Sequence, residues 1–97
     1  MFWKKKEPKE NVLDRVEGEK RFLVQTNETR FLFVWFNDAF YVRRITSRDP
    51  RYGLVTSLKG NKNYSVNDLD LSTEIEYFQP RLNKIVDGGF VRSIAVR

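Results

Sequence analysis

Six residues hold most of the chemistry that this sequence of 97 residues offers. Four are arginines within nine consecutive positions, and a tyrosine stands on either side of them: Tyr41, Arg43, Arg44, Arg48, Arg51 and Tyr52. Arginine keeps its charge at every accessible pH and pairs with phosphate or carboxylate groups, while tyrosine offers a ring for stacking. The cluster predicts contact with an anionic partner, although the solvated edge of a β-hairpin explains the same residues.

Two aspartates, Asp68 and Asp70, form a second candidate pair. On a strand this spacing puts both carboxylates on one face, where they could bind a divalent cation or share a proton. An edge strand or loop that keeps both in solvent explains the spacing more simply. Gly88 and Gly89 are typical of a turn, and no glycine-rich phosphate loop is present. We therefore expect neither a metal nor a cofactor.

The chain contains no cysteine and no histidine. Disulfides, Cys/His zinc sites, thiol nucleophiles and histidine acid–base relays are thereby excluded. The remaining reactive groups are carboxylates, lysines, tyrosines and hydroxyls, and no motif sets a nucleophile beside a base. We expect that the protein is not an enzyme.

Charge is unevenly distributed along a chain whose net charge is +5. Residues 22–66 hold seven basic and three acidic groups, whereas residues 67–77 hold four acidic groups and no base. Such an uneven distribution of charge favours binding to a partner with its own charge pattern, or self-association. The longest apolar run has six residues, far short of the about 18 that a membrane span needs. Because the start, MFWKKK, lacks the apolar stretch of a secretory signal, we expect a cytoplasmic protein without a membrane partner.

From Lys20 onward the sequence is rich in aromatic and β-branched residues. Runs at 20–26, 30–36 and 40–46, separated by short polar breaks, predict a three-stranded antiparallel meander. Both alternating sets of the middle run are apolar, so that strand should be covered on both faces. Shorter alternating runs predict further strands at 53–58, 64–66, 75–78, 82–86 and, after a turn at 87–89, at 90–96.

These elements predict a mainly β fold, a small antiparallel sheet or partly closed barrel. It should form one domain over residues 20–97. Residues 1–19 should form a tail of mixed charge or a short helix, for which 6–16 are the candidate positions. Within the sheet we expect Phe31, Phe33, Val34, Trp35 and Phe36 to be largely buried.

The order of the segments resembles a known family. Four segments carry the likeness: FYVRRI (40–45), GLVTSLKGNKNY (53–64), VNDLDLSTEIEYF (66–78) and RLNKIV (81–86). The self-cleaving C-terminal domains of LexA and phage repressors show, at similar spacings, a Y-V-K-R-L strand, an S-x-N-P-x-Y stretch, an acidic connection and a G-R-V-V strand. The resemblance implies a β-barrel with a dimer surface.

The catalytic groups of that family are missing. There a serine in a G-x-S-M motif is the nucleophile and the lysine of V-K-R is its base, but Arg43 occupies the lysine position and the only methionine is Met1. An arginine cannot release its proton to act as a base. The resemblance thus implies a chain that keeps the barrel and its dimer surface without the chemistry.

Two functions stay open at this point. The first is a protein-interaction module that forms a homodimer or docks on a regulatory partner through a strand edge or an aromatic patch. The second is a small basic β-barrel that binds nucleic acid, with stacking on Trp35, Tyr41 or Tyr52. The acidic stretch and the doubly apolar middle strand favour the first. Because adjacent arginines of a strand cannot both face one groove, we expect only weak, nonspecific nucleic-acid binding. Arg43 and Arg44 should point to opposite faces of their strand, one of them over an aromatic ring or beside a carboxylate.

Incubation at alkaline pH should leave the chain intact. High pH accelerates cleavage by a hydroxyl–lysine dyad because it deprotonates the lysine, and this sequence places Arg43 at the base position. Mass spectrometry of the incubated protein checks this. Specific backbone cleavage that disappears when one serine is mutated would show that this interpretation of Arg43 is wrong.

Overall fold

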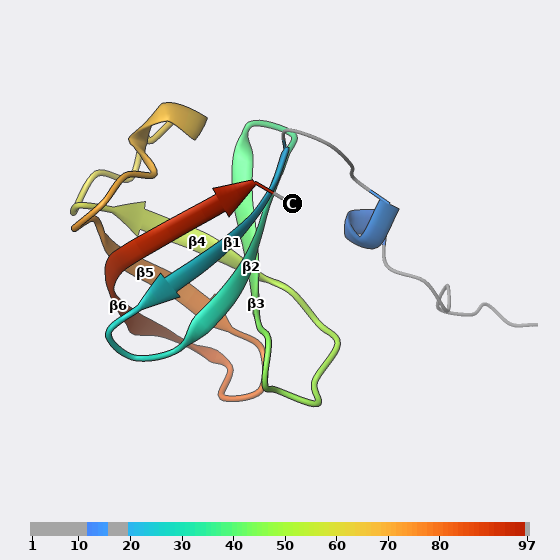
Figure 1. Ribbon diagram of the computed structural model, residues 1–97. Coiled ribbons are helices and arrows are strands. Elements are labelled where there is room, and N and C mark those ends of the chain that lie inside the picture. Colours follow the sequence, from blue (N-terminus) through green and yellow to red (C-terminus); the bar gives the residue numbers. More distant parts are fainter. Residues whose placement is uncertain (1–11, 16–19, 97) are drawn as a thin grey trace, which may run out of the picture.

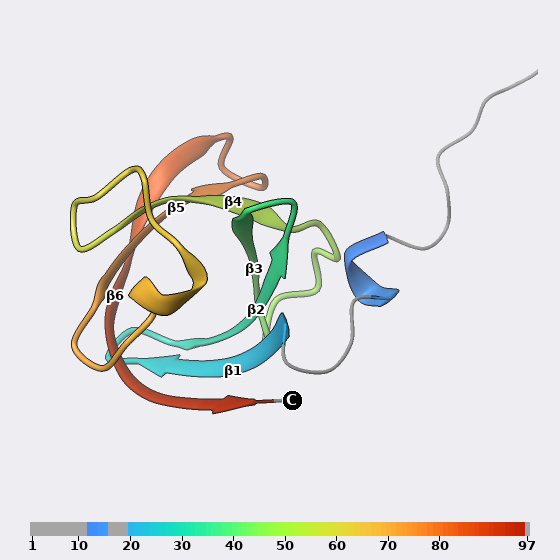
Figure 2. The ribbon, with the colours of Figure 1, turned by 90° about the horizontal axis from the view of Figure 1, so that it is seen from above.

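A six-stranded antiparallel sheet closes into a ring in the computed structural model, which describes residues 12–15 and 20–96 (Figure 1). The strands are β1 (Arg21–Thr26), β2 (Arg30–Phe36), β3 (Ala39–Arg44), β4 (Gly53–Leu58), β5 (Glu74–Gln79) and β6 (Lys84–Val96). They follow one another around the ring in chain order, and β6 pairs with β1 (Figure 2). The all-β fold expected from the sequence is confirmed.

The first three strands form the expected meander. β1 pairs with β2 and β2 with β3, each antiparallel. The β2–β3 turn consists of Asn37 and Asp38, whose φ angles are 50° and 60°. Asn and Asp tolerate this left-handed conformation better than other non-glycine residues, and two such residues join antiparallel strands with the right twist. The local sequence thereby sets the register of the hairpin.

β6 is one strand of 13 residues and not two strands around a turn, so the turn expected at 87–89 is wrong. Its first part pairs with β5 and its last part with β1. The register shifts beside Gly88, because Asp87 faces Glu76 while Gly89 faces Ile75. An extra residue of this kind is a β-bulge, which bends a strand without ending it. The two glycines allow β6 to bend around the ring and close it.

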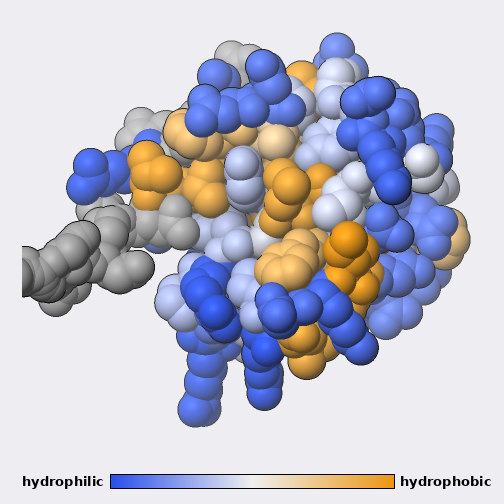
Figure 3. Space-filling model, turned by 180° about the vertical axis from the view of Figure 1, so that it is seen from behind, coloured by the Kyte–Doolittle hydropathy of each residue, from blue (hydrophilic) through white to orange (hydrophobic). Residues whose placement is uncertain are grey.

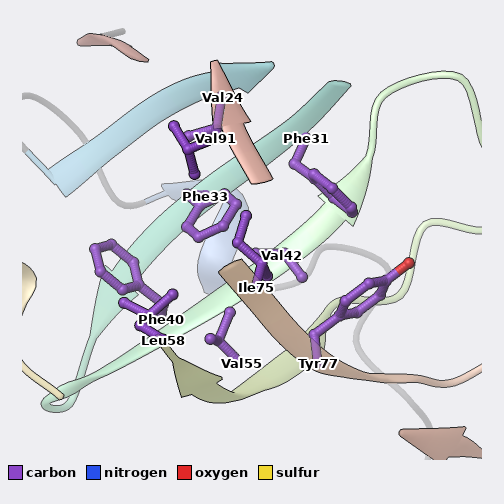
Figure 4. Packing of buried hydrophobic residues seen from close by; sticks show 10 residues of the cluster. All are labelled: Val24, Phe31, Phe33, Phe40, Val42, Val55, Leu58, Ile75, Tyr77 and Val91. Carbon is purple, nitrogen blue, oxygen red and sulfur yellow. The ribbon is translucent and has the colours of Figure 1, made fainter. Parts of the chain in front are cut away.

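The interior of the ring is filled with apolar side chains. Ten buried residues form this core: Val24, Phe31, Phe33, Phe40, Val42, Val55, Leu58, Ile75, Tyr77 and Val91 (Figure 4). The rings of Phe31 and Tyr77 meet edge to face at 5.2 Å between centroids, and those of Phe33 and Phe40 do so at 5.3 Å. Edge-to-face pairs add to the free energy that burial alone supplies.

A second cluster covers the outer face of β2, as the sequence predicts. A short 3₁₀ turn, η1 (Val12–Arg15), sets Leu13 against Leu32 and Val34. Phe31, Phe33 and Val34 are fully buried, whereas Trp35 and Phe36 keep some exposure. Of the helix expected at 6–16, the structure describes only these four residues of 3₁₀ turn, and the other positions lie outside the described residues.

The brief strand expected at 64–66 is wrong. A 3₁₀ turn, η3 (Val66–Asp68), occupies this stretch, with Ser65 as its N-cap. The backbone N–H of Ser65 donates to Asp68 Oδ2 at 2.6 Å, and the N–H of Leu71 donates to Asp70 Oδ1 at 2.8 Å. Both carboxylates hold local turns, so they do not share the face of a strand.

Tyr64, just before this turn, bridges the weakest seam of the ring. β3 and β4 pair through two residue pairs, Tyr41 with Leu54 and Val42 with Gly53. Further along, the Tyr64 hydroxyl accepts from the N–H of Phe40 at 3.1 Å and donates to the carbonyl of Val55 at 2.6 Å. One side chain thus links the two strands where they no longer pair directly.

Replacing Tyr64 with Phe should lower the free energy of unfolding by about 1–3 kcal/mol, because it leaves two backbone groups without their partner. Chemical denaturation measures the change. Tyr41→Phe is the matched control, since no described residue bonds to the Tyr41 hydroxyl and its loss should cost less than about 0.5 kcal/mol. Equal effects of the two substitutions would contradict the bridging role.

Candidate functional site

Three adjoining hollows open at the end of the ring where β3 and β5 finish. Their volumes are about 210, 520 and 240 Å³, and Arg44 lines all three. The walls come from the end of β3, the β3–β4 connection (45–52) and the β5–β6 turn (80–83). Both connections lie at the lower end of the ring in Figure 1. We call these hollows together the end groove.

The weak seam between β3 and β4 creates this groove. Because the pairing between the two strands stops at Val42 and Gly53, β3 runs on past the start of β4. The connection then turns away and is held by two backbone bonds, from the N–H of Ile45 to the carbonyl of Arg30 and from the N–H of Ser47 to the carbonyl of Arg44. The gap that is left exposes Arg44.

Arginines outnumber carboxylates around the three hollows. The arginines are Arg43, Arg44, Arg48, Arg51 and Arg81, and the carboxylates are Asp49 and, in the third hollow only, Glu28 and Asp87. Asp49 is committed to Arg51, which binds it through Nε at 2.9 Å and through a terminal nitrogen at 2.7 Å. This pairing lowers the pKa of Asp49 to about 2. Among the described residues, the side chains of Arg44, Arg48 and Arg81 have no ion pair and no hydrogen bond. The groove therefore carries an excess of positive charge.

Tyr77 and Gln79 add uncharged polar groups from β5. The side-chain amide of Gln79 donates to the Tyr77 hydroxyl at 3.3 Å. That hydroxyl points away from the other core side chains in Figure 4. Burial raises the pKa of Tyr77, and the nearby charge of Arg44 partly opposes this rise. The hydroxyl therefore stays protonated near neutral pH and can donate a hydrogen bond.

The six residues predicted from the sequence divide between two places. Arg44, Arg48 and Arg51 line the end groove, whereas Tyr41 and Tyr52 belong to the outer cluster beside η1. Arg43 also touches the wall of one hollow, but its guanidinium lies over the Tyr52 ring, 5.6 Å from the centroid. The expected division of Arg43 and Arg44, with one of them over an aromatic ring, is confirmed.

Tyr52 fastens the N-terminal turn to the ring. Its hydroxyl donates to Asp14 Oδ1 at 2.5 Å, and burial together with this carboxylate raises the pKa of Tyr52. The Nε of Arg43 is buried and has no hydrogen-bond partner. Arg43 therefore contributes mainly to packing in the outer cluster and little to the solvent-exposed surface. Packing in the outer cluster therefore explains the presence of Tyr41, Arg43 and Tyr52.

Sequence reasoning missed the contribution of β5 and the turn after it. Tyr77, Gln79 and Arg81 come from a segment far along the chain from the arginine cluster, and only the closing of the ring brings them to Arg44. Pro80 marks the turn in the sequence, but no local pattern says which strands meet there.

Comparisons with protein-family models, curated proteins and solved structures found no match. The resemblance to repressor C-terminal domains stays a prediction. Within residues 12–15 and 20–96, no cluster of three or more acidic side chains is arranged to hold a metal ion. The part of the chain that the structure describes contains no helix with the length and apolar character needed to cross a membrane.

Leu13→Ala should lower the free energy of unfolding by about 2–3 kcal/mol, because Leu13 is 6% exposed and anchors the outer cluster. The same substitution at Val12, which is 55% exposed, should have almost no effect. Denaturation curves provide both values. If Leu13→Ala is as harmless as Val12→Ala, the turn does not cover β2 in solution.

Proposed function

We propose that this chain is a non-enzymatic protein-interaction module that pairs with a second copy of itself through the outer face of β4, β5 and β6. The observation that carries the proposal is a row of apolar side chains around the outside of the ring, in which Leu54 and Ile85 stay exposed. The resemblance to repressor domains, which implies a dimer surface, supports the same proposal.

Ring closure decides which kind of surface is available. The sequence led us to expect association through an open strand edge, but β1 pairs with β6, so the terminal strands are both occupied. Closed sheets protect themselves in this way from edge-to-edge pairing. Association therefore falls to an outer face of the sheet.

The apolar row crosses the strands in register. Val34 pairs with Tyr41, Tyr41 with Leu54, and Phe78 with Ile85. Val55 pairs with Tyr77, and continuing this register by one residue brings Leu54 alongside Phe78. We call these five side chains the belt. Side chains that face one another across neighbouring strands lie within contact distance.

One half of the belt is covered and the other half is open. Leu13 of η1 packs with Val34, and Tyr41 packs beside them. Leu54 and Ile85, in contrast, are 42% and 53% exposed. Apolar surface of this kind interrupts the hydrophilic side chains seen in Figure 3. A contiguous apolar surface rimmed by polar groups is typical of an interaction site.

Charges beside the open half favour a second copy as the partner. Glu76 pairs with Asp87 on the same two strands, and Glu74 lies close enough that the charge of Asp87 raises its pKa. The opposite side of the open half is the β5–β6 turn, which carries Arg81. A two-fold axis that runs along the belt, across the strands, places the acidic side of each copy against the basic side of the other.

Nucleic-acid binding is the second candidate, because Arg44, Arg48 and Arg81 carry unpaired charge. The aromatic residues that were expected to stack on bases lie elsewhere. Trp35 packs edge-on against Phe40 at 4.8 Å, and the two candidate tyrosines belong to the outer cluster. The groove thus supplies charge without a stacking platform.

Light scattering should find a dimer at micromolar concentration, and Ile85→Glu or Leu54→Glu should shift the protein to monomer. A buried, unpaired carboxylate in the middle of an apolar interface costs several kcal/mol, enough to weaken a micromolar dimer at least 100-fold.

Leu71→Glu is the matched control, because Leu71 is 58% exposed but lies outside the belt. It should leave the dimer intact. A wild-type protein that is monomeric across the micromolar range would overturn the proposal, and so would equal disruption by Leu71→Glu.

A further inference from the structure

None of the five belt side chains lines the end groove, although the β5–β6 turn with Arg81 borders both surfaces. The walls of the groove belong to the end of the ring, whereas the belt lies on the outer face of the strands. We infer that the groove binds an acidic segment of a partner protein, whose carboxylates pair with Arg44 and Arg48. The inference goes beyond self-association and does not depend on it.

Charge is the first support. Arg44 and Arg48 together line the largest of the hollows, and the side chain of neither has an ion pair or hydrogen bond to a described residue. Asp49 cannot neutralise them, because its two oxygens are already bound by Arg51. A guanidinium presents its donors in a fork that matches the two oxygens of a carboxylate. Glu28 and Asp87 line the third hollow, but Asp49 is the one carboxylate on the wall of the largest hollow. The arginines of the largest hollow therefore outnumber its carboxylates, which favours an anion from a partner.

The apolar wall is the second support. Val42, Pro80 and Leu82 line the same hollow as Arg44, and Leu82 is an exposed apolar side chain of the β5–β6 turn. A groove that combines arginines with apolar surface fits a peptide that carries apolar residues between its acidic ones. The protonated Tyr77 hydroxyl adds an uncharged donor on the wall.

The same wall argues against a nucleic acid as the ligand. Single-strand binders combine positive charge with open aromatic rings, on which bases stack. The only ring on the wall of the first and third hollows besides Phe31 is that of Tyr77, and these two rings pack against each other in the core at 5.2 Å.

Fluorescence anisotropy tests the inference with a labelled peptide in which Glu alternates with Leu. Arg44→Gln and Arg48→Gln should each weaken its binding about fivefold, as expected for the loss of one partly exposed ion pair. Arg92→Gln is the control of equal charge, because Arg92 is exposed on β6 and lines none of the three hollows. It should leave binding unchanged.

Two further ligands make the test specific. The same peptide with Gln in place of Glu should not bind, and a single-stranded oligonucleotide should lose its binding near physiological salt. Equal binding of the Gln peptide, equal weakening by Arg92→Gln, or no binding of the Glu peptide would overturn the inference. Nucleic acid would be the better ligand if the oligonucleotide bound more tightly than the Glu peptide. Its log affinity should then fall with log salt at a slope of about −0.7 for each arginine contact.

Repeating the titration with Ile85→Glu separates this inference from the proposed dimer. The Glu peptide should bind the monomeric variant as well as it binds the wild type, because Ile85 lines none of the three hollows. Loss of peptide binding together with loss of the dimer would show that the groove is not an independent site.

Discussion

The short seam between β3 and β4 determines the architecture of this protein. Gly53, the first residue of β4, lies so close to β5 that an added Cβ would stand 1.7 Å from the carbonyl oxygen of Phe78. Only glycine permits this approach, and it lets β4 lean onto β5 while its pairing with β3 stays short. The ring therefore closes fully everywhere except at one seam.

The two ends of the seam between β3 and β4 differ in how they are closed. At one end the Tyr64 hydroxyl joins Phe40 to Val55, and its ring stacks with that of Phe40 at 6.0 Å between centroids. At the other end no hydrogen bond from a described side chain joins the two strands, and the hollows around Arg44 open there. Backbone groups that leave a sheet need new partners or contact with water, so an unbridged seam is a natural position for a binding groove.

Local patterns in the sequence predict the parts of the structure that depend on neighbouring residues. The meander, the doubly covered β2 and the opposite directions of Arg43 and Arg44 all follow from alternation along a strand, and the structure confirms them. The continuous β6 was missed because glycines mark turns and bulges alike, and only the partner strands distinguish the two.

The end groove depends on contacts between distant segments, which a local pattern cannot show. Arg81 follows Arg44 by more than thirty positions, and the two meet only because β5 and β6 complete the ring. Asp68 and Asp70 lie exposed in a loop, which is the simpler of the two explanations that their spacing allowed. Their side chains bind the backbone within a few residues, and this local bonding overrides the strand that alternation suggested.

The belt shows how one apolar surface can have two kinds of cover. Leu13 reaches the half beside Val34 as part of the same chain, so its packing carries no cost of bringing two molecules together. The half formed by Leu54, Phe78 and Ile85 has no such tether. A separate molecule that covers it must offset the loss of translational and rotational freedom with a few apolar side chains and their charged neighbours. The same surface chemistry therefore gives a fixed intramolecular contact on one side of the ring and leaves the other side for the weak, concentration-dependent contact that we propose.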